Sequence, residues 1–548
     1  MKYLSRLLVL FMLPVLVWSC DDDDEIVRQA ADRFVRPLQT ALTVPYTAGE
    51  ATLRIECRNA AWEILPGDDA TDDNIITSFT PSSGQPQGDE RTYALVTVAY
   101  GENTGVADRQ QKLWVVNSLT GERTAVKISQ SSANAHTDLM IDPATKYQPV
   151  VGFGGMYDPI IWCRSYMPTQ EEIEKLYSTD GMGYTVMRLM IYPNESDWST
   201  DVEAAKYAQA QGAVIFACPW DCTDALADKV DYNGNQTKHL KHENYGAYAD
   251  HIIKYIEYMK QNGINLYAVS MQNEPDMEFT YWTPAEVVDF VVNYGARIRA
   301  TGVKLMSPET CGMRPDYTDA VINNPAAMTN TDIIAGHLYQ GFTDLSSSYV
   351  NERHKYITGI YGRITGKTWW MTEHLFNDGE SEEDSSKWIF GKWDYCLNNL
   401  AKEIHMTMEG FGSAYVYWYL KRFYGLMGDD DKRSPVPSGE ITKNGYIMAH
   451  YAKYASSTTR VHIDGTNEKL MATAYVNEAG TEVTVVALNM RGEPLFVNLG
   501  ISGAKSCEGI YTDADVNMQP ADARVLASGA GVGVTLQPFS ITSVRIRL

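Results

Sequence analysis

The 548-residue sequence has few cysteines, and they form no recognisable disulfide or metal-binding pattern. Its 8 cysteines are spread too thinly to build a disulfide framework. Cys218 and Cys222 are the one close pair, and the sequence leaves a bridge between them open. No second cysteine pair or group of histidines completes a zinc site with them. We therefore expect neither a metal nor a cofactor.

Positive charge is scarce as well. The chain has 46 lysines and arginines against 69 aspartates and glutamates, which gives a formal net charge of −23 at pH 7. Such a balance provides no general attraction for an anionic polymer. The Gly-Phe-Gly-Gly motif at 152–155 also lacks the Lys-Ser/Thr that follows in a phosphate-binding loop. Both absences argue against nucleic acid as a partner.

Long apolar runs are absent after the N-terminus, so no later segment predicts a membrane-spanning helix. The composition, 44% hydrophobic and 21% charged, is that of an ordinary globular protein. A chain of this length exceeds what one hydrophobic core normally supports. We therefore expect two or three domains.

The N-terminus has the pattern of a secretory signal peptide over residues 1–19, because a basic start precedes the apolar stretch at 7–18. The following Cys20 resembles the lipidated cysteine of a bacterial lipoprotein. Four aspartates at 21–24 resemble the export tag of lipoproteins on the outer face of the Gram-negative outer membrane. We expect a lipid anchor at Cys20 and an acidic tether over 20–37, with simple secretion or a periplasmic location as the alternative.

Residues 38–132 predict a small β sandwich. Alternating segments at 51–57 and 92–100 are separated by clusters of Gly, Pro, Asp and Ser, as in antiparallel sheets. Five features occur in the order found in the BACON domain of carbohydrate-active surface lipoproteins, which this region resembles: Trp62, Pro-Ser-Ser-Gly at 81–84, Asn103, Arg109 and Ile-Ser-Gln-Ser at 128–131. That resemblance implies either a spacer or a glycan or mucin contact.

Residues 138–460 predict a (β/α)8 TIM barrel, because strand and helix patterns alternate regularly there. The eight candidate strands begin at Val150, Thr185, Ala213, Leu266, Lys304, Ile333, Thr368 and Ser413. Strand alternation returns at 461–548, which predicts a C-terminal β sandwich packed on the barrel. The fold class is thus multidomain: a small N-terminal β sandwich, a TIM barrel and a C-terminal β sandwich.

Polar residues gather where the predicted barrel strands end, which is where active sites of such barrels lie. Glu274 and Glu373 each follow a short apolar run. A pair of carboxylates at this edge is what cleavage of a glycosidic bond requires. Other strand-end candidates are Arg188, Trp220, Asn273, His337, Tyr339 and Trp418.

Four ordered motifs resemble those of glycoside hydrolase family 30: Gly-Phe-Gly-Gly at 152–155, Gln-Asn-Glu-Pro at 272–275, Gly-His-Leu-Tyr at 336–339 and Met-Thr-Glu-His at 371–374. The similarity extends from about residue 138 to the C-terminus, and it implies that the strand preceding the barrel, at 137–147, joins the C-terminal sandwich. It also implies that Glu274 is the acid/base and Glu373 the nucleophile of a retaining double displacement, with the carboxyl groups about 5 to 5.5 Å apart.

The surroundings of the two glutamates suggest further roles. Arg188 and His337 are candidates to keep Glu373 ionised and oriented, and Asn273 to hydrogen-bond the sugar 2-hydroxyl. Aromatic faces for pyranose rings are offered by Trp220 and Trp418. The negative charge of Glu373 is expected to favour the protonated form of Glu274.

The segment at 416–425 is similar to the glucuronoxylanase branch of family 30, in which the methylglucuronate of xylan is bound at three positions, here Trp418, Arg422 and Tyr424. Arginine suits this task because its planar fork binds a carboxylate at two oxygens. The branch usually has Tyr and Ser where this chain has Leu375 and Asp378, and the stretch at 429–437 is an insertion.

The sequence therefore predicts a retaining endo-β-1,4-xylanase acting on (methyl)glucuronoxylan. Its expected substrate contacts are Trp220, Asn273, His337, Tyr339, Trp418, Arg422 and Tyr424. Leu375 and Asp378 keep open a relaxed requirement for the acidic branch, or cleavage of neutral xylan. Other family 30 activities, such as β-1,6-glucanase or an exo-acting β-glycosidase, and a non-catalytic glycan-binding lipoprotein are the alternatives.

Overall fold

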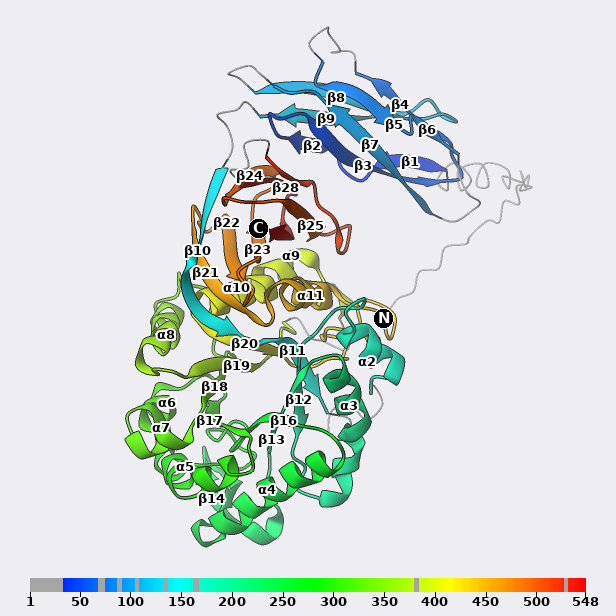
Figure 1. Ribbon diagram of the computed structural model, residues 1–548. Helices are drawn as coiled ribbons and strands as arrows, with labels where there is room; N and C mark the ends of the chain where they lie inside the picture. The colour runs from blue at the N-terminus through cyan, green and yellow to red at the C-terminus, as the bar shows by residue number, and fades with distance from the viewer. Residues whose placement is uncertain are drawn as a thin grey trace, which may run out of the picture. The chain divides into compact units, whose positions relative to one another are not determined.

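The computed structural model describes residues 33–67, 74–85, 91–103, 108–131, 137–158, 160, 167–378, 384–526 and 531–548 (Figure 1). The chain divides into two compact units, Met1–Ala135 and His136–Leu548. The expected signal peptide, Cys20 and most of the expected tether lie outside the described residues. Within the described ranges, no helix is long and apolar enough to cross a membrane.

The first unit contains two β sheets that enclose one apolar core. One sheet has the order β1 (Phe34–Pro37), β3 (Gly49–Arg58), β7 (Thr92–Tyr100) and β5 (Ile76–Thr80). The other has the order β2 (Ala41–Val44), β9 (Arg123–Gln130), β8 (Arg109–Asn117), β4 (Trp62–Pro66) and β6 (Ser83–Gly84). Strand β1 lies inside the segment that we expected to be a tether. It belongs to the folded unit instead, because Val35 is buried and the strand pairs with β3.

The residues that carry the BACON-like resemblance tie this unit together. The Asn103 side chain donates to the Ser131 carbonyl at 3.1 Å, and Arg109 Nε donates to the Gln130 side chain at 2.8 Å. Trp62 is buried in the core between the sheets. These contacts join segments that are distant in the sequence, so they support a structural role for these side chains.

The second unit begins with a sandwich strand and continues into a closed barrel of eight parallel strands. In barrel order these are β11 (Gly152–Tyr157), β12 (Val186–Met190), β13 (Val214–Cys218), β16 (Leu266–Ser270), β17 (Lys304–Thr310), β18 (Ile333–His337), β19 (Thr368–His374) and β20 (Gly412–Tyr417). Each begins within two residues of its predicted start. The predicted fold class is confirmed.

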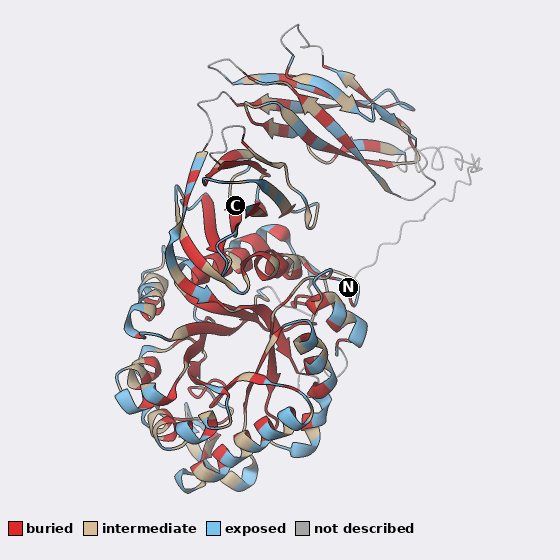
Figure 2. Cartoon of the chain, in the orientation of Figure 1, coloured by how far each residue is buried: buried red, intermediate tan, exposed pale blue. Residues whose placement is uncertain are grey.

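Helices surround the barrel: α2 (Gln170–Tyr177), α3 (Val202–Ala210), α4 (Tyr245–Gln261), α5 (Pro284–Arg299), α6 (Pro315–Ile322), α7 (Pro325–Asn330), α8 (Ser348–Gly359), α9 (Trp393–Cys396), α10 (Lys402–Glu409) and α11 (Lys443–Ala455). Thr283 and Glu286 form a capping box that starts α5. A hairpin of β14 (Ala227–Tyr232) and β15 (Asn235–Leu240) precedes α4. Figure 2 shows the barrel strands as mainly buried and the outer faces of the helices as exposed.

The glycine motif at 152–155 lets two barrel strands approach closely. A Cβ atom added to Gly154 would lie 1.8 Å from the carbonyl oxygen of Val186 on β12. No side chain fits in that space, so this glycine is required by the packing of β11 against its neighbour.

The C-terminal sandwich is one ten-stranded sheet folded over its own core, with the order β26 (Gln519–Pro520), β25 (Ser506–Thr512), β29 (Ser540–Arg547), β23 (Glu482–Asn489), β22 (Leu470–Val476), β21 (Thr458–Asp464), β10 (Thr137–Val150), β24 (Leu495–Gly500), β28 (Gly531–Leu536) and β27 (Ala523–Val525). Strand β10 continues to Val150, beyond the expected 147, and β21 begins at Thr458, before the expected 461. Buried His450 of α11 contacts Ser543 at 2.8 Å and Thr512 at 2.9 Å, which joins the barrel to this sandwich.

Candidate active site

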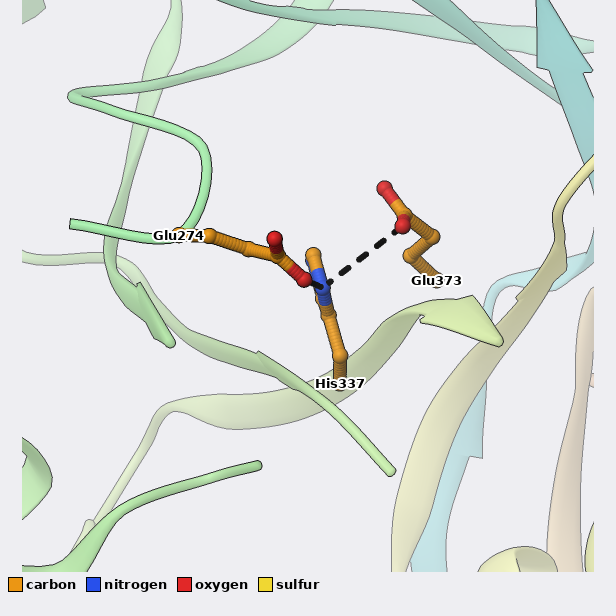
Figure 3. Close-up of side chains that lie close together, drawn as sticks. All are labelled: Glu274, His337 and Glu373. Carbon is orange, nitrogen blue, oxygen red and sulfur yellow. Dashed lines mark hydrogen bonds and ion pairs between the residues drawn. The ribbon is translucent and has the colours of Figure 1, made fainter. Parts of the chain in front are cut away.

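The two predicted glutamates meet at the carboxyl ends of the barrel strands. Glu274 follows β16, and Glu373 lies near the end of β19. Between them stands His337, the last residue of β18 (Figure 3). All three side chains are buried, and one ligand atom from each lies within 4.8 Å of the other two. The closed barrel brings together residues from distant parts of the chain, because parallel strands end at the same edge.

Glu274 is held through its backbone and its side chain. Its amide donates to the carbonyl of Glu309 at 3.0 Å, and its φ of 43° is in the left-handed region. The carboxylate oxygen Oε1 lies 2.8 Å from Nδ1 of His337. We expected His337 to orient Glu373; its hydrogen bond goes to Glu274 instead, and Glu373 is 3.9 Å away. The direction of the imidazole ring at the end of β18 decides this pairing.

Glu373 has a hydrogen-bond donor on each carboxylate oxygen. Arg188, from β12, forms an ion pair with Oε2. The Tyr339 hydroxyl donates to Oε1 at 2.7 Å. Burial alone would lower the pKa of Arg188, but the charges of Glu309 and Glu373 overcome this and raise it. Burial, followed by the charges of Glu373 and Glu274, raises the pKa of Tyr339, so both donors keep their protons.

A third carboxylate, Glu309 near the end of β17, was missed by the sequence reasoning. It is completely buried, with Oε1 3.1 Å from Nη2 of Arg188 and 3.7 Å from Nε2 of His337. Burial raises its pKa, but Arg188 and His337 outweigh that effect and lower it to about 2. Its position at the end of the strand beginning at Lys304 was the signal that could have found it.

The same carboxylates determine the charge of His337. Burial favours the neutral ring, but the charge of Glu373, the hydrogen bond with Glu274 and the nearby Glu309 carboxylate together raise its pKa to about 9. The imidazole is therefore cationic at neutral pH, and Nδ1–H is the donor to Glu274.

Asn273 presents one end of its amide to Arg188. Its Oδ1 accepts from Arg188 Nη2 at 2.7 Å, which places Nδ2 at the other end. Among the described residues Nδ2 has no hydrogen-bond partner, although it is buried. A buried amide donor without a partner is available to an incoming hydroxyl group.

Trp220 packs beneath Arg188, with its ring centroid 4.4 Å from the guanidinium carbon. It is only 2% exposed, so it has little surface for a sugar ring. Its neighbour Trp418, which follows β20, has its ring centroid 5.7 Å away and is 7% exposed. The two rings are therefore neighbours, and Trp220 is the one that contacts the Arg188 guanidinium.

Arg422 lies beside an acidic residue of the insertion. Its Nε is 3.5 Å from Oδ2 of Asp429, a side chain without solvent exposure. Its guanidinium carbon is 5.7 Å from the ring centroid of Tyr424. Lys421, the residue before Arg422, is paired with Glu172 at 2.9 Å.

The two positions that depart from the glucuronoxylanase pattern have partners of their own. Leu375 packs against the large apolar core of the second unit. The carboxylate of exposed Asp378 accepts a hydrogen bond from the Tyr395 hydroxyl at 2.8 Å.

Both Cys218 and Cys222 are free thiols, so they form no bridge, and Cys218 donates to Glu309 at 3.0 Å.

Glu274, His337 and Glu373 are also a possible set of metal-ligand atoms. Two contacts argue against a cation there. The Arg188 guanidinium already neutralises Glu373, and a protonated His337 has no lone pair to offer at Nδ1. The geometry fits a pair of carboxyl groups that act on a substrate better than it fits metal binding.

Comparisons with known proteins show which family the chain resembles. Residues 177–368 match the glycosyl hydrolase family 30 TIM-barrel domain. The chain is 31% identical over 418 residues to glucuronoxylanase XynC of Bacillus subtilis (strain 168), covering 75% of this chain and 92% of that relative. It is 23% identical over 328 residues to endo-1,6-beta-D-glucanase BGN16.3 of Trichoderma harzianum, covering 54% of this chain and 61% of that enzyme.

Among solved structures, a GH30 endoxylanase from Clostridium papyrosolvens C71 superposes with a TM-score of 0.62 at 27% identity, covering 75% of this chain and all of that one. Three findings lead to the same conclusion. They are the closed barrel with its β-rich C-terminal region, the carboxylate pair at the strand ends, and the 31% identity to glucuronoxylanase XynC over 92% of that relative. The chain is a glycoside hydrolase and belongs to family 30.

Proposed function

We propose that this protein is a retaining endo-β-1,4-xylanase acting on (methyl)glucuronoxylan, with Glu373 as nucleophile and Glu274 as acid/base. The observation that carries the proposal is the carboxylate separation. Oxygens of the two groups lie within 4.8 Å, close to the roughly 5 to 5.5 Å of retaining glycosidases and well below the roughly 6.5 to 9.5 Å of inverting ones. A separation this short is typical of enzymes in which the second carboxylate itself, and not a water molecule, attacks the sugar.

In the first step, the Glu373 carboxylate attacks the anomeric carbon and the bond to the leaving oxygen breaks. Glu274 donates its proton to that oxygen. Because His337 Nδ1–H occupies Oε1 of Glu274, the transferable proton resides on Oε2. Arg188 and Tyr339 orient the nucleophile through their donors.

In the second step, Glu274 removes a proton from water as the water oxygen attacks the anomeric carbon, and Glu373 leaves as a carboxylate. Asn273 Nδ2 is directed to the sugar 2-hydroxyl in this scheme, since Arg188 already occupies the other end of the amide. A hydrogen bond there strengthens as the sugar acquires positive charge.

Substituting the acid/base tests these roles. Glu274→Ala is expected to slow xylan cleavage by about 10²- to 10⁴-fold, the usual contribution of general acid catalysis. A dinitrophenyl β-xylobioside needs no protonation of its leaving group, so its first turnover is expected to be much less affected. Equal losses on both substrates, measured by release of reducing ends and of dinitrophenol, would contradict the assignment of Glu274.

For the substrate, the similarity to glucuronoxylanase XynC and the residues at Trp418, Arg422 and Tyr424 support xylan with acidic branches. The Asp429 carboxylate beside Arg422 weakens the attraction for a uronate, because the guanidinium has a negative partner from its own chain. We therefore propose that the acidic branch is preferred but not required.

The substrate assignment can be tested by digesting methylglucuronoxylan, unbranched arabinoxylan and β-1,6-glucan in parallel. Glu373→Gln serves as the blank, and the products are identified by mass spectrometry. Faster cutting of glucuronoxylan, with some cutting of arabinoxylan, would support the proposal. Asp429→Asn is expected to increase the preference for the decorated polymer, and Lys421→Gln, which alters a pair not involving Arg422, serves as its control. Absence of xylan products would overturn the substrate while leaving the family unchanged.

A second candidate is another family 30 linkage, such as β-1,6-glucan. Leu375 and Asp378 favour it, because the usual uronate contacts are missing at these positions. A non-catalytic glycan-binding role is disfavoured, since Glu274, Glu373 and their donors are all in place.

We also propose that the protein is a surface lipoprotein of a Gram-negative outer membrane, anchored at Cys20, with the N-terminal β sandwich as a BACON-like spacer. The sequence at 1–24 supports this location. Two results would support the proposed surface anchor. Labelled palmitate should be incorporated into the wild type but not into Cys20→Ala, and protease should reach the protein on intact cells. A soluble, unlabelled wild-type protein in the medium would contradict the anchor.

A further inference from the structure

Glu309 lies next to Arg188 and His337 of the candidate active site. Its side chain is completely buried at the end of β17. Oxygen Oε1 is 3.1 Å from Arg188 Nη2 and 3.7 Å from His337 Nε2. Oxygen Oε2 accepts from the Cys218 thiol at 3.0 Å. One carboxylate therefore contacts the cations that support both other carboxylates.

The contact with Arg188 fixes the guanidinium on two sides. Nη1 binds Glu373, whereas Nη2 is shared between Glu309 and the amide oxygen of Asn273. Trp220 covers the face of the guanidinium. Without Glu309, the Nη2 side of Arg188 would depend on a neutral amide alone, and the guanidinium would be less precisely aimed at Glu373.

The contact with His337 concerns charge. Four groups face this imidazole: Glu274 at Nδ1, Glu309 at Nε2, Glu373 at 3.9 Å from Nδ1, and the Tyr339 ring. Nε2 is buried and makes no hydrogen bond with the described residues. The Glu309 carboxylate is thus the negative charge on the Nε2 side of the ring, and it favours a proton on that nitrogen.

The two cations link Glu309 to both catalytic candidates. Arg188 also contacts the Glu373 carboxylate, and His337 Nδ1 also contacts the Glu274 carboxylate. The backbone adds a direct connection, because the Glu309 carbonyl accepts the Glu274 amide at 3.0 Å.

We propose that Glu309 is a positioning residue of the proposed glycosidase reaction: it orients Arg188 toward Glu373 and keeps His337 cationic, so that His337 donates to Oε1 of Glu274. This inference rests on the proposed function for its kinetic part. Its electrostatic part concerns the resting protein and can be measured without any substrate.

The first measurement is the titration of His337 by NMR in protein labelled at histidine Cε1, with the signal assigned by its loss in His337→Gln. In the wild type the ring is expected to titrate near pH 9. In Glu309→Gln the titration is expected to move toward the ordinary value of about 6.5. A wild-type His337 that titrates at or below that ordinary value would overturn the proposal even if no variant folds.

The matched control is Glu403→Gln, which alters another buried glutamate bonded to a histidine. Glu403 Oε1 lies 2.7 Å from Nδ1 of His374. This control is expected to leave the His337 titration unchanged. An equal shift in both variants would mean that general loosening of the barrel, and not the Glu309 charge, moves the titration, and would overturn the proposal.

The kinetic readout separates positioning from binding. Glu309→Gln is expected to lower kcat on a xylan oligosaccharide by about 10- to 150-fold, the range for loss of one charge-assisted contact. KM is expected to change little, because Glu309 acts through Arg188 and His337. Glu309→Asp, which keeps the charge, should recover part of kcat and part of the raised titration.

The two proposals can fail separately. If the wild type does not cut xylan but His337 titrates high and shifts in Glu309→Gln, the substrate is wrong and the electrostatic role of Glu309 is supported. If the wild type is active and Glu309→Gln changes neither kcat nor the titration, the role of Glu309 is refuted and the proposed function stands.

Discussion

The Tyr339 hydroxyl provides a test of how the nucleophile is controlled in each step. It donates to Glu373 Oε1 at 2.7 Å, and its raised pKa keeps it protonated through neutral and alkaline pH. A hydrogen bond to a charged group contributes about 1.5–3 kcal/mol. In rate, that range corresponds to about 10- to 150-fold. Tyr339→Phe removes this bond and leaves the ring in place.

The two steps should not be affected equally. The bond is strongest when Glu373 is fully ionised, and it weakens as the carboxylate becomes an ester with the sugar. Loss of the hydroxyl therefore slows the second step, in which negative charge returns to Glu373, more than the first. We expect the steady-state rate to fall by up to about 150-fold while the covalent glycosyl-enzyme accumulates.

The assay is a stopped-flow burst of dinitrophenol from dinitrophenyl β-xylobioside, with intact-protein mass spectrometry for the covalent intermediate. Tyr415→Phe is the control, because Tyr415 donates to buried Glu403 at 2.6 Å and does not contact Glu373. The control should show no accumulation of intermediate. A Tyr339→Phe variant without a burst, or with an unchanged steady-state rate, would refute the reasoning.

Three further predictions concern stability and packing. Arg188→Ala leaves Glu373 buried without its cation, so it is expected to lower the free energy of unfolding by about 3–5 kcal/mol in denaturant titrations. An unchanged free energy of unfolding would contradict the role of Arg188 as the partner of Glu373. His450 has a pKa lowered to about 3 by burial. The unfolded chain therefore binds a proton that the folded chain does not, and stability should fall by about 1.4 kcal/mol per pH unit below about pH 6.5. His450→Gln should reduce this slope relative to the wild type; equal slopes would contradict the assignment. Gly154→Ala should prevent soluble folding or lower Tm strongly because its Cβ meets Val186, whereas Gly359→Ala, where nothing lies within 4 Å, should be tolerated.

Much of the barrel was predictable because its signal is local. Buried parallel strands are short apolar runs, and eight such runs separated by amphipathic segments predict the closed sheet. The two glutamates were predictable for a related reason, since a carboxylate directly after a buried run is unusual. The limits of the sandwich were less clear, because β10 crosses from the sandwich sheet to the start of the barrel in one continuous strand.

The side-chain partners were less predictable. Glu309 was missed although it ends a predicted strand, and His337 was expected on Glu373 but bonds Glu274. Arg422 was read as an open uronate ligand, and the structure places Asp429 beside it. In each case the partner comes from another strand or loop, and its choice depends on the direction of a side chain.

By itself, then, the sequence determined the number and position of the barrel strands, the carboxylate pair and the family to which the chain belongs. Only the tertiary structure decided which donor serves which carboxylate. Arg188 and Glu373 are 185 positions apart, and they meet because the barrel closes. Hydrophobic periodicity is written within a few residues of sequence, whereas a hydrogen bond depends on tenths of an ångström between elements that folding alone brings together.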